Sequence, residues 1–485
     1  MDGEGPPELV TSNSCRNDKK LVAFIIEQRM RLIEVVMPMV IFFSNVKENF
    51  RALWLYNNYE SNIPPNASRP LTTAYRKRRH LERLNMLIAY STPGSQLNVG
   101  GYLKRAHISF FNKEDFYCLY NIYHAKKANL IFVESSASVP RLYNSALVRG
   151  SGFVNPYPLK ERLVVSCFSL VECRDSTNYG RHLNARQNLA RGDTALREMP
   201  FVSLLIQDFW MRCHHCLIYA PLVLIPCQSC SLALFCSETC RKRAHDEYHS
   251  MECTIMPILL GQYSSMEILA LRLTIRIFNI LDGMMDELEL YIRSLANNMV
   301  VAEYNTPYGC QPNAKVDYGK VYRLTTNRSK LCKKKITDNG LKAVSLARML
   351  VREHGLPNSF VELLAELTVR HLHILRSNAL VLHCSVDEPS KNEYSSSSVP
   401  YALVLVTTGS MFNHSCDANV EYCLSPDGAI MFVANRSIPR GTQMHINYRI
   451  DPTDTRYAFE CYCQKCTTKR ILDQPSTLME VPERL

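Results

Sequence analysis

The sequence has no apolar run long enough to cross a membrane. Its longest run, from Val35 to Phe43, contains Pro38 and falls well short of the ~20 residues that a bilayer requires. The first seven residues, MDGEGPP, lack the basic flank and apolar core of a signal peptide. We therefore expect no membrane partner and an intracellular protein, in the nucleus, the cytoplasm or both. Its 19 cysteines should then be reduced or metal-bound rather than paired in disulfides.

A strong excess of either charge is also missing. The net charge of +11 and the pI of about 8.8 are a mild basic bias over 485 residues. The cysteine spacing is not that of a ββα zinc finger and no arginine-rich recognition helix follows it, so we expect no direct sequence-specific nucleic-acid binding. The hydrophobic content of 46% and charged content of 21% are those of a folded protein, long enough for two or three domains.

Cysteine is abundant, and its spacing is regular. Two tetrahedral zinc sites need eight sulfur or imidazole ligands, delivered as close pairs from short turns. One stretch of the sequence supplies that number, and neither chance clustering nor a disulfide knot accounts for eight ligands in this register. The ligands are Cys213, Cys216, Cys227, Cys230, Cys236, Cys240, His249 and Cys253.

A further cysteine cluster lies near the end of the sequence. It reads Cys461-x-Cys463-x2-Cys466. Three cysteines leave a tetrahedral site one ligand short, so a fourth ligand is expected from elsewhere in the chain.

The first third of the chain predicts helices. Residues 1–20 are expected to be disordered, and residues 21–155 to form a helical module. The basic run at 76–80 is interpreted as the solvated face of a helix, with a nuclear-localisation signal as the alternative.

The clearest helical pattern runs from residue 102 to residue 130. It predicts two helices joined by a turn, with Asn112 capping the second. A helix, a turn and an aromatic-rich helix resemble one tetratricopeptide unit, although a generic helical hairpin explains the pattern equally well. The second helix should bury a stripe formed by Phe116, Leu119, Tyr120 and Tyr123.

Together, the eight ligands resemble a MYND zinc finger, in which two metal sites interleave. The stretch LFCSETC at 234–240 is especially close to the family's form. His245 competes for the histidine position, but the spacing His249-x3-Cys253 puts both of those side chains on one side of a helical turn. On this pattern one zinc ion would be bound by Cys213, Cys216, Cys236 and Cys240, and the other by Cys227, Cys230, His249 and Cys253.

Motifs on both sides of the finger resemble a SET methyltransferase core. Gly180-Arg181-His182 precedes the finger, and the stretches NHSC (413–416), VANRSI (433–438) and INY (446–448) follow it, before the last cysteine cluster. This order resembles the SET-and-MYND (SMYD) family of protein lysine methyltransferases, in which the finger is inserted into a split SET domain. The helical N-terminal extension is similar to the branch of that family with tetratricopeptide repeats.

The resemblance implies an α+β fold, in which a SET β-fold is split by the finger, a post-SET zinc loop follows, and an α-helical, tetratricopeptide-like module precedes it. Beyond the N-terminal module, the implied domains are the first part of the SET fold (160–212), the MYND finger (213–253), a helical inserted region (254–380), the catalytic core (381–450), the post-SET zinc loop (451–470) and a C-terminal tail (471–485).

The resemblance also implies S-adenosylmethionine (SAM) as cofactor and three zinc ions. Tyr448 would be the catalytic residue, with its hydroxyl next to the transferred methyl group and the incoming amine. Cys416 would complete the third zinc site with Cys461, Cys463 and Cys466, so that the metal joins the cofactor-binding turn to the post-SET loop. The residues implied in cofactor binding are Gly180, Arg181, His182, Asn378, Asn413, His414, Tyr448 and Phe459.

Taken one at a time, these residues have simpler explanations. Tyr448 and Phe459 fit a packed core, and Asn413-His414 fits a capped turn. Only their joint order favours a cofactor site.

The sequence departs from the family where the substrate channel is expected. Gly441-Thr442-Gln443 replaces the usual Gly-Glu-Glu, and only eight residues separate Tyr448 from Tyr457. The chain is also expected to lack the C-terminal helical domain of most relatives, since Leu485 follows soon after the last zinc cysteine.

Two functions therefore stand side by side. The first is methylation of a lysine on a protein substrate, and the alternative is an inactive adaptor whose finger grips proline-rich peptides. SAM binding distinguishes them, because an adaptor does not need the cofactor. A monomer is expected in both cases.

Overall fold

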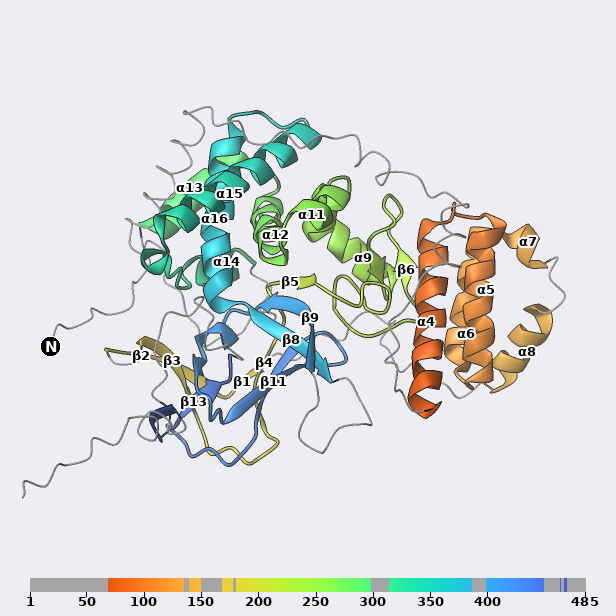
Figure 1. Cartoon of the computed structure of the whole chain (residues 1–485), viewed down its shortest axis with the longest axis horizontal. Helices are drawn as coiled ribbons and strands as arrows, with labels where there is room; N and C mark the ends of the chain where they lie inside the picture. The colour runs from red at the N-terminus through yellow and green to blue at the C-terminus, as the bar shows by residue number, and fades with distance from the viewer. Residues whose placement is uncertain are drawn as a thin grey trace, which may run out of the picture.

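The computed structural model describes residues 69–134, 139–149, 168–177, 180–297, 314–385, 398–448, 463 and 466–468. The segment expected to be disordered, most of the first predicted helix region, Phe459 and Cys461 lie outside these ranges. In Figure 1 the helices α4 to α8 (orange) stack side by side next to α9 and β6, the helices α11 to α16 gather on another side, and the larger sheets lie beneath them. The expected α+β class with an N-terminal helical region is confirmed. None of the helices in the described part is long and apolar enough to span a bilayer.

The N-terminal helices share a small core of their own, which includes Ile88, Val99 and Ile122. Ser95 caps the second of these helices by accepting a hydrogen bond from the backbone N–H of Asn98 at 3.3 Å. The helices are α4 (Arg69–Tyr90), α5 (Gln96–Phe111), α6 (Asp115–Ala128), α7 (Leu130–Glu134) and α8 (Val139–Arg149).

Two local predictions for this module are wrong. Asn112 ends α5, and the residue before α6 is Glu114, which makes no side-chain capping bond. The buried face of α6 is also rotated by about one residue from the predicted stripe: Tyr117 and Ile122 are buried, whereas Tyr123 is 58% exposed. The rotation arises because α6 packs on α5 and also faces the finger, so it buries polar Asn121 instead of an aromatic ring.

The remaining helices connect the finger to the sheets. A capping box between Ser264 and Glu267 starts α12, which packs against α16, and both helices are almost completely buried. The buried ion pair of Arg272 with Glu252, at 2.7 Å, ties α12 to the end of the finger. The elements are α9 (Glu238–Ala244), a π-helical turn η2 (His245–His249), α10 (Ser250–Glu252), α11 (Met256–Gln262), α12 (Ser265–Ile280), α13 (Met285–Ala296), α14 (Ala314–Tyr322), a 3₁₀ turn η3 (Arg328–Lys330), α15 (Lys333–Glu353) and α16 (Phe360–Asn378).

The strands form small sheets that segments far apart in sequence complete together. Their orders are β1-β4-β12-β11, β10-β13-β3-β2, β5-β9-β8 and β6-β7, so strands before the finger pair with strands after the helical region. The strands are β1 (Phe168–Ser169), β2 (Val171–Ser176), β3 (Gly180–Ala185), β4 (Thr194–Glu198), β5 (Val202–Leu205), β6 (Ile225–Pro226), β7 (Leu234–Phe235), β8 (Leu380–Ser385), β9 (Ser398–Leu405), β10 (Asn413–His414), β11 (Val420–Leu424), β12 (Ile430–Ala434) and β13 (Gln443–Ile446), with a 3₁₀ turn η4 (Gly409–Met411) before β10.

A buried polar joint fastens the N-terminal module to the finger. Arg105 is fully buried and donates to Asn85 Oδ1 and Asn121 Oδ1, both at 2.9 Å. Burial lowers the pKa of Arg105 to about 10, so the guanidinium stays charged at neutral pH. The three side chains also donate to backbone carbonyls of the finger and of the loop leading into it, namely those of Trp210, Pro221, Leu222 and Leu224. We call Asn85, Arg105 and Asn121 with these carbonyls the module–finger joint.

Candidate functional site

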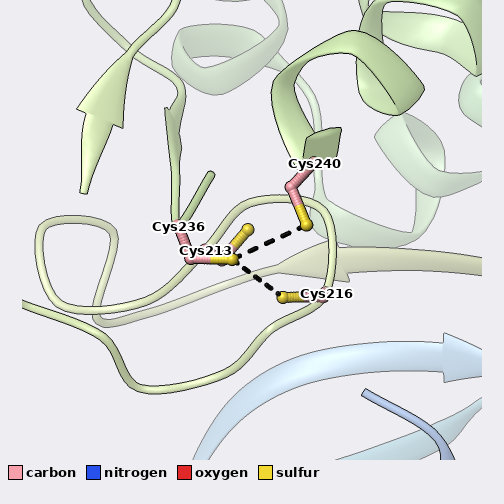
Figure 2. Close-up of side chains that lie close together, drawn as sticks. All are labelled: Cys213, Cys216, Cys236 and Cys240. Atoms are coloured by element: carbon pink, nitrogen blue, oxygen red, sulfur yellow. Dashed lines mark hydrogen bonds between the residues drawn. The ribbon is translucent and has the colours of Figure 1, made fainter. Parts of the chain in front are cut away.

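The first metal cluster gathers four sulfur atoms from the finger. Figure 2 shows the side chains of Cys213, Cys216, Cys236 and Cys240 converging from a loop, the end of β7 and α9. Cys236 Sγ lies 3.6 Å from the Sγ atoms of both Cys216 and Cys240. With zinc–sulfur bonds of ~2.3 Å the edges of a tetrahedron measure about 3.8 Å, whereas a disulfide bond measures about 2.05 Å. The cluster therefore fits a zinc ion and not a disulfide.

The second cluster combines three cysteines with a histidine, all buried. Cys227 Sγ lies 3.8 Å from Cys253 Sγ, and Cys230 Sγ lies 3.5 Å from His249 Nε2. His249 ends the turn η2 and faces the cluster, whereas the side chain of His245 is 66% exposed. The structure thus places His249, and not His245, with the other ligands, in the interleaved pairing that the sequence predicts.

A third cluster joins the turn after β10 to the last cysteines. Cys416 Sγ lies 3.4 Å from Cys466 Sγ, and the sulfur of Cys463 belongs to the same group. Cys461 lies outside the described residues, so its place as fourth ligand stays a prediction. Three thiols at this spacing fit a zinc ion that takes one more ligand.

His414 links this cluster to Tyr448. Its Nδ1 accepts the backbone N–H of Tyr448 at 3.1 Å, and its Nε2 lies 3.2 Å from Cys416 Sγ. Burial, and then the nearby His445, lower the pKa of His414, so the ring is neutral. Because Nδ1 is an acceptor, the ring proton belongs on Nε2, where it can donate to the Cys416 sulfur.

One sheet carries five of the predicted cofactor residues, Gly180, Arg181 and His182 on β3 and Asn413 and His414 on β10. In it β13 pairs with β3 on one side, through Met444 and Leu183, and in parallel with β10 on the other, through His414 and Ile446. Gly180 opens β3 with φ of +60°, a backbone conformation that favours glycine, and His182 Nδ1 bonds to the Gly180 carbonyl at 2.8 Å. Segments separated by more than 200 residues are thereby brought to the same sheet.

A cavity of about 470 Å³ lies beside this sheet, and Tyr448 and Asn378 both line it. The Tyr448 hydroxyl donates to the Phe412 carbonyl at 2.6 Å. Asn378 is held by its own Nδ2, which donates to the carbonyls of Ile374 and Thr325. None of the described residues that line the cavity is an aspartate or a glutamate.

The other predicted cofactor residues that the structure describes are not among those that line this cavity. Asn413 and His414 lie one strand away from Tyr448, on β10, and the Arg181 guanidinium donates to the Arg323 carbonyl at 2.8 Å. Arg181 and Asn378, at the end of α16, nevertheless hold the same segment, since Asn378 donates to the carbonyl of Thr325, two residues beyond Arg323. The cofactor roles of all these residues remain predictions.

Sequence reasoning missed Glu198, the last residue of β4. It is fully buried, and its carboxylate accepts hydrogen bonds from Thr407 Oγ1 at 3.0 Å, from the backbone N–H of Thr408 at 3.1 Å and from that of Gly409. These donors start the turn η4, which leads directly into Phe412 and β10. The local sequence gives no signal for this role, because Glu198 follows Arg197 at the end of β4 and its partners lie at residues 407–409.

Comparison with known proteins places these features in a family. The SET domain family matches residues 180–449. The chain is similar to protein-lysine N-methyltransferase SMYD4 of Mus musculus, at 25% identity over 359 residues, which cover 59% of this chain and 44% of the relative. The protein of that name from Homo sapiens is 24% identical over 387 residues, 64% of this chain and 47% of the relative.

A shorter match to the Gallus gallus protein of that name is 39% identical over 106 residues, 18% of this chain and 14% of the relative. The chain spans less than half the length of these relatives. Among solved structures, the SET domain of LSMT bound to lysine and AdoHcy aligns with a TM-score of 0.27 and 13% identity, over 66% of this chain and 56% of that chain.

Proposed function

Because the chain belongs to the SET domain family, and its order of motifs is that of the SET-and-MYND group, we propose that it is a SAM-dependent methyltransferase acting on lysine side chains of proteins. The observation that carries the proposal is the shared cavity of Tyr448 and Asn378 beside the strand that bears Asn413 and His414. The methyl group of SAM and the substrate lysine would meet in this cavity, next to Tyr448.

The cavity wall suits the chemistry that lysine methylation requires. When bound, SAM supplies an electrophilic methyl group, and the attacking amine must be neutral although a free lysine has a pKa of ~10.4. With no carboxylate in the described wall, the cavity does not stabilise an ammonium ion, and its apolar surface lowers the amine pKa. The Phe412 carbonyl and the Tyr448 hydroxyl are fixed oxygens that can orient the amine as it reacts.

The zinc clusters have a structural role in this proposal. The two finger clusters shape the surface that carries the module–finger joint, and the third cluster ties the turn of Cys416 and His414 to the post-SET cysteines. Residues Cys213, Cys216, Cys236 and Cys240 would hold one ion, and Cys227, Cys230, His249 and Cys253 a second. Cys416, Cys461, Cys463 and Cys466 would hold the third.

Purified, zinc-loaded protein tests the proposal directly. It should bind SAM and transfer a radiolabelled methyl group to lysine in proteins of a cell lysate. A zinc-loaded protein that binds no SAM and transfers no methyl group would instead act as an adaptor.

The adaptor has one structural observation in its favour. Tyr219 of the finger is 42% exposed, and aromatic rings of this kind receive proline-rich peptides. Proline-rich peptides would be the partners under this alternative, and calorimetric titration tests their binding. We also propose a monomer without specific nucleic-acid binding that resides in the nucleus, the cytoplasm or both. Light scattering, DNA titration and a fluorescent fusion protein test these points.

A further inference from the structure

A second cavity, of about 420 Å³, adjoins the one that contains Tyr448. The two cavities share three wall residues, Val381, His383 and Tyr422. The shared wall is where the Tyr422 hydroxyl donates to the Val381 carbonyl of β8 at 3.2 Å. The far wall comes from Ile218 and Tyr219 of the finger and from Arg212, which directly precedes the finger. The finger and the catalytic core thus line two neighbouring cavities with a shared wall.

Arg212 is the charged residue in the described wall of this second cavity. Its guanidinium lies over the Tyr401 ring, with Cζ 3.7 Å from the ring centroid, and Cζ lies 5.5 Å from the centroid of the Tyr219 ring. The side chain is only 11% exposed. Contact with the rings of Tyr401 and Tyr219 holds the guanidinium in place, so the N–H groups that it still has to offer point in a defined direction.

The hydrogen bonds of Arg212 are incomplete. Its Nε donates to Asp208 at 3.4 Å and its Nη1 to the Leu217 carbonyl at 3.1 Å, but among the described residues Nη2 has no acceptor. The Asp208 carboxylate forms ion pairs with both Arg212 and Arg78, and Arg78 forms a second ion pair with Glu82. Neither carboxylate lines the cavity, and no other aspartate or glutamate does so in the described wall. A partly buried donor of positive charge therefore borders a cavity without an acid.

We propose that this second cavity binds an aspartate or glutamate side chain of the substrate protein, within a few residues of the target lysine. The proposal rests on the proposed function for the first cavity, because that cavity takes the lysine. A carboxylate accepts hydrogen bonds from a planar guanidinium with good geometry, and it would supply an acceptor for Nη2 of Arg212. Among the described residues β8 is the outer strand of its sheet, and Val381 and His383 on this strand belong to the walls of both cavities, so a peptide that spans the two cavities would run along β8.

A proline-rich peptide is the less suitable occupant. The Tyr401 ring face is already covered by Arg212, which leaves Tyr219 and Tyr422 as the rings for proline to contact. Proline also has no side-chain acceptor for the guanidinium. Preference for proline is therefore an outcome that contradicts the proposal.

Lysine-centred peptide libraries provide the test. Each library fixes glutamate, glutamine or proline at one flanking position, and both binding to the zinc-loaded full chain and methyl transfer are measured. Glutamate at one or two positions should bind about tenfold tighter than glutamine, since a charge-assisted hydrogen bond is gained. In methyl transfer the same positions should lower KM and leave kcat unchanged.

Two variants assign the preference to Arg212. Arg212→Gln should abolish it, and Arg212→Lys should weaken it because the ammonium lacks the forked geometry. The matched control is Arg174→Gln on β2, an exposed arginine that should keep the full preference. A glutamate preference that survives in Arg212→Gln overturns the proposal, as does equal binding of glutamate and glutamine libraries to the unaltered protein.

The outcomes separate this inference from the proposed function. Methyl transfer without any glutamate preference leaves the function standing and removes the acid-binding cavity. Glutamate-dependent binding without methyl transfer supports the cavity and contradicts catalysis. If Arg212→Gln does not fold, the comparison of libraries on the unaltered protein still decides.

Discussion

Two hydrogen bonds hold Tyr448 in place: its hydroxyl donates to the Phe412 carbonyl, and its backbone N–H donates to Nδ1 of His414. The Tyr448→Phe change removes the hydroxyl and keeps the ring and the backbone bond. We expect methyl transfer to slow by ~10²–10³, as when one preorganised donor at a reacting centre is lost. SAM affinity should change far less. Single-turnover transfer and calorimetric SAM binding measure the two effects, and an unchanged rate would place the reacting centre elsewhere.

Glu198 acts at a distance from the cavity, through the backbone of residues 407–409. The Glu198→Gln change keeps the shape but replaces one accepting oxygen with a donor that faces an N–H group. We expect the free energy of unfolding to fall by about 2–3 kcal/mol and SAM affinity to weaken, since η4 leads into β10. Glu421→Gln, on the exposed face of β11, is the control. Urea denaturation and SAM titration should separate the two variants, and identical curves would contradict the role.

At the scale of elements, the third zinc cluster couples the turn after β10 to the post-SET loop. The Cys416→Ser change should reduce the metal content from three zinc ions per chain to two, and should weaken SAM binding. Cys423→Ser, an exposed cysteine on β11, should retain three. Metal analysis by mass spectrometry checks the count. Loss of all three ions would show that the fold had collapsed rather than that one site was emptied.

The two clusters of the finger could be predicted from sequence because their ligands are close along the chain and chemically rare, whereas Cys416 of the third cluster was found only through the family resemblance. His249 and Cys253, for example, needed only local helical spacing. Glu198 could not be predicted, since its partners lie more than 200 residues away and only the folded chain brings them together. The rotation of α6 was missed for a similar reason. Asn121 is buried because it donates a hydrogen bond to a carbonyl of the finger, and local hydrophobic periodicity contains no information about that contact.

At the scale of the whole molecule, the module–finger joint decides whether the N-terminal helices are an independent unit. Arg105→Leu leaves the side-chain oxygens of Asn85 and Asn121 and the Leu224 carbonyl without their donor. We expect the free energy of unfolding to fall by about 2–4 kcal/mol. Lys104→Leu, its exposed neighbour, should have little effect. Thermal unfolding with limited proteolysis checks this. Equal stability of the two variants would mean that the module is only loosely attached.

The joint also bears on how freely the sequence can drift. Its side chains Asn85, Arg105 and Asn121 recognise only main-chain carbonyls on the other side. A carbonyl is present whatever amino acid occupies the position, so substitutions at Trp210, Leu222 or Leu224 keep the acceptor as long as the loop keeps its path. Within the joint, the helices therefore supply the side chains that must be kept, while the other side contributes its main-chain path, and among the described residues only the ion pairs of Arg78 with Asp208 and of Lys127 with Glu238 require a particular side chain there.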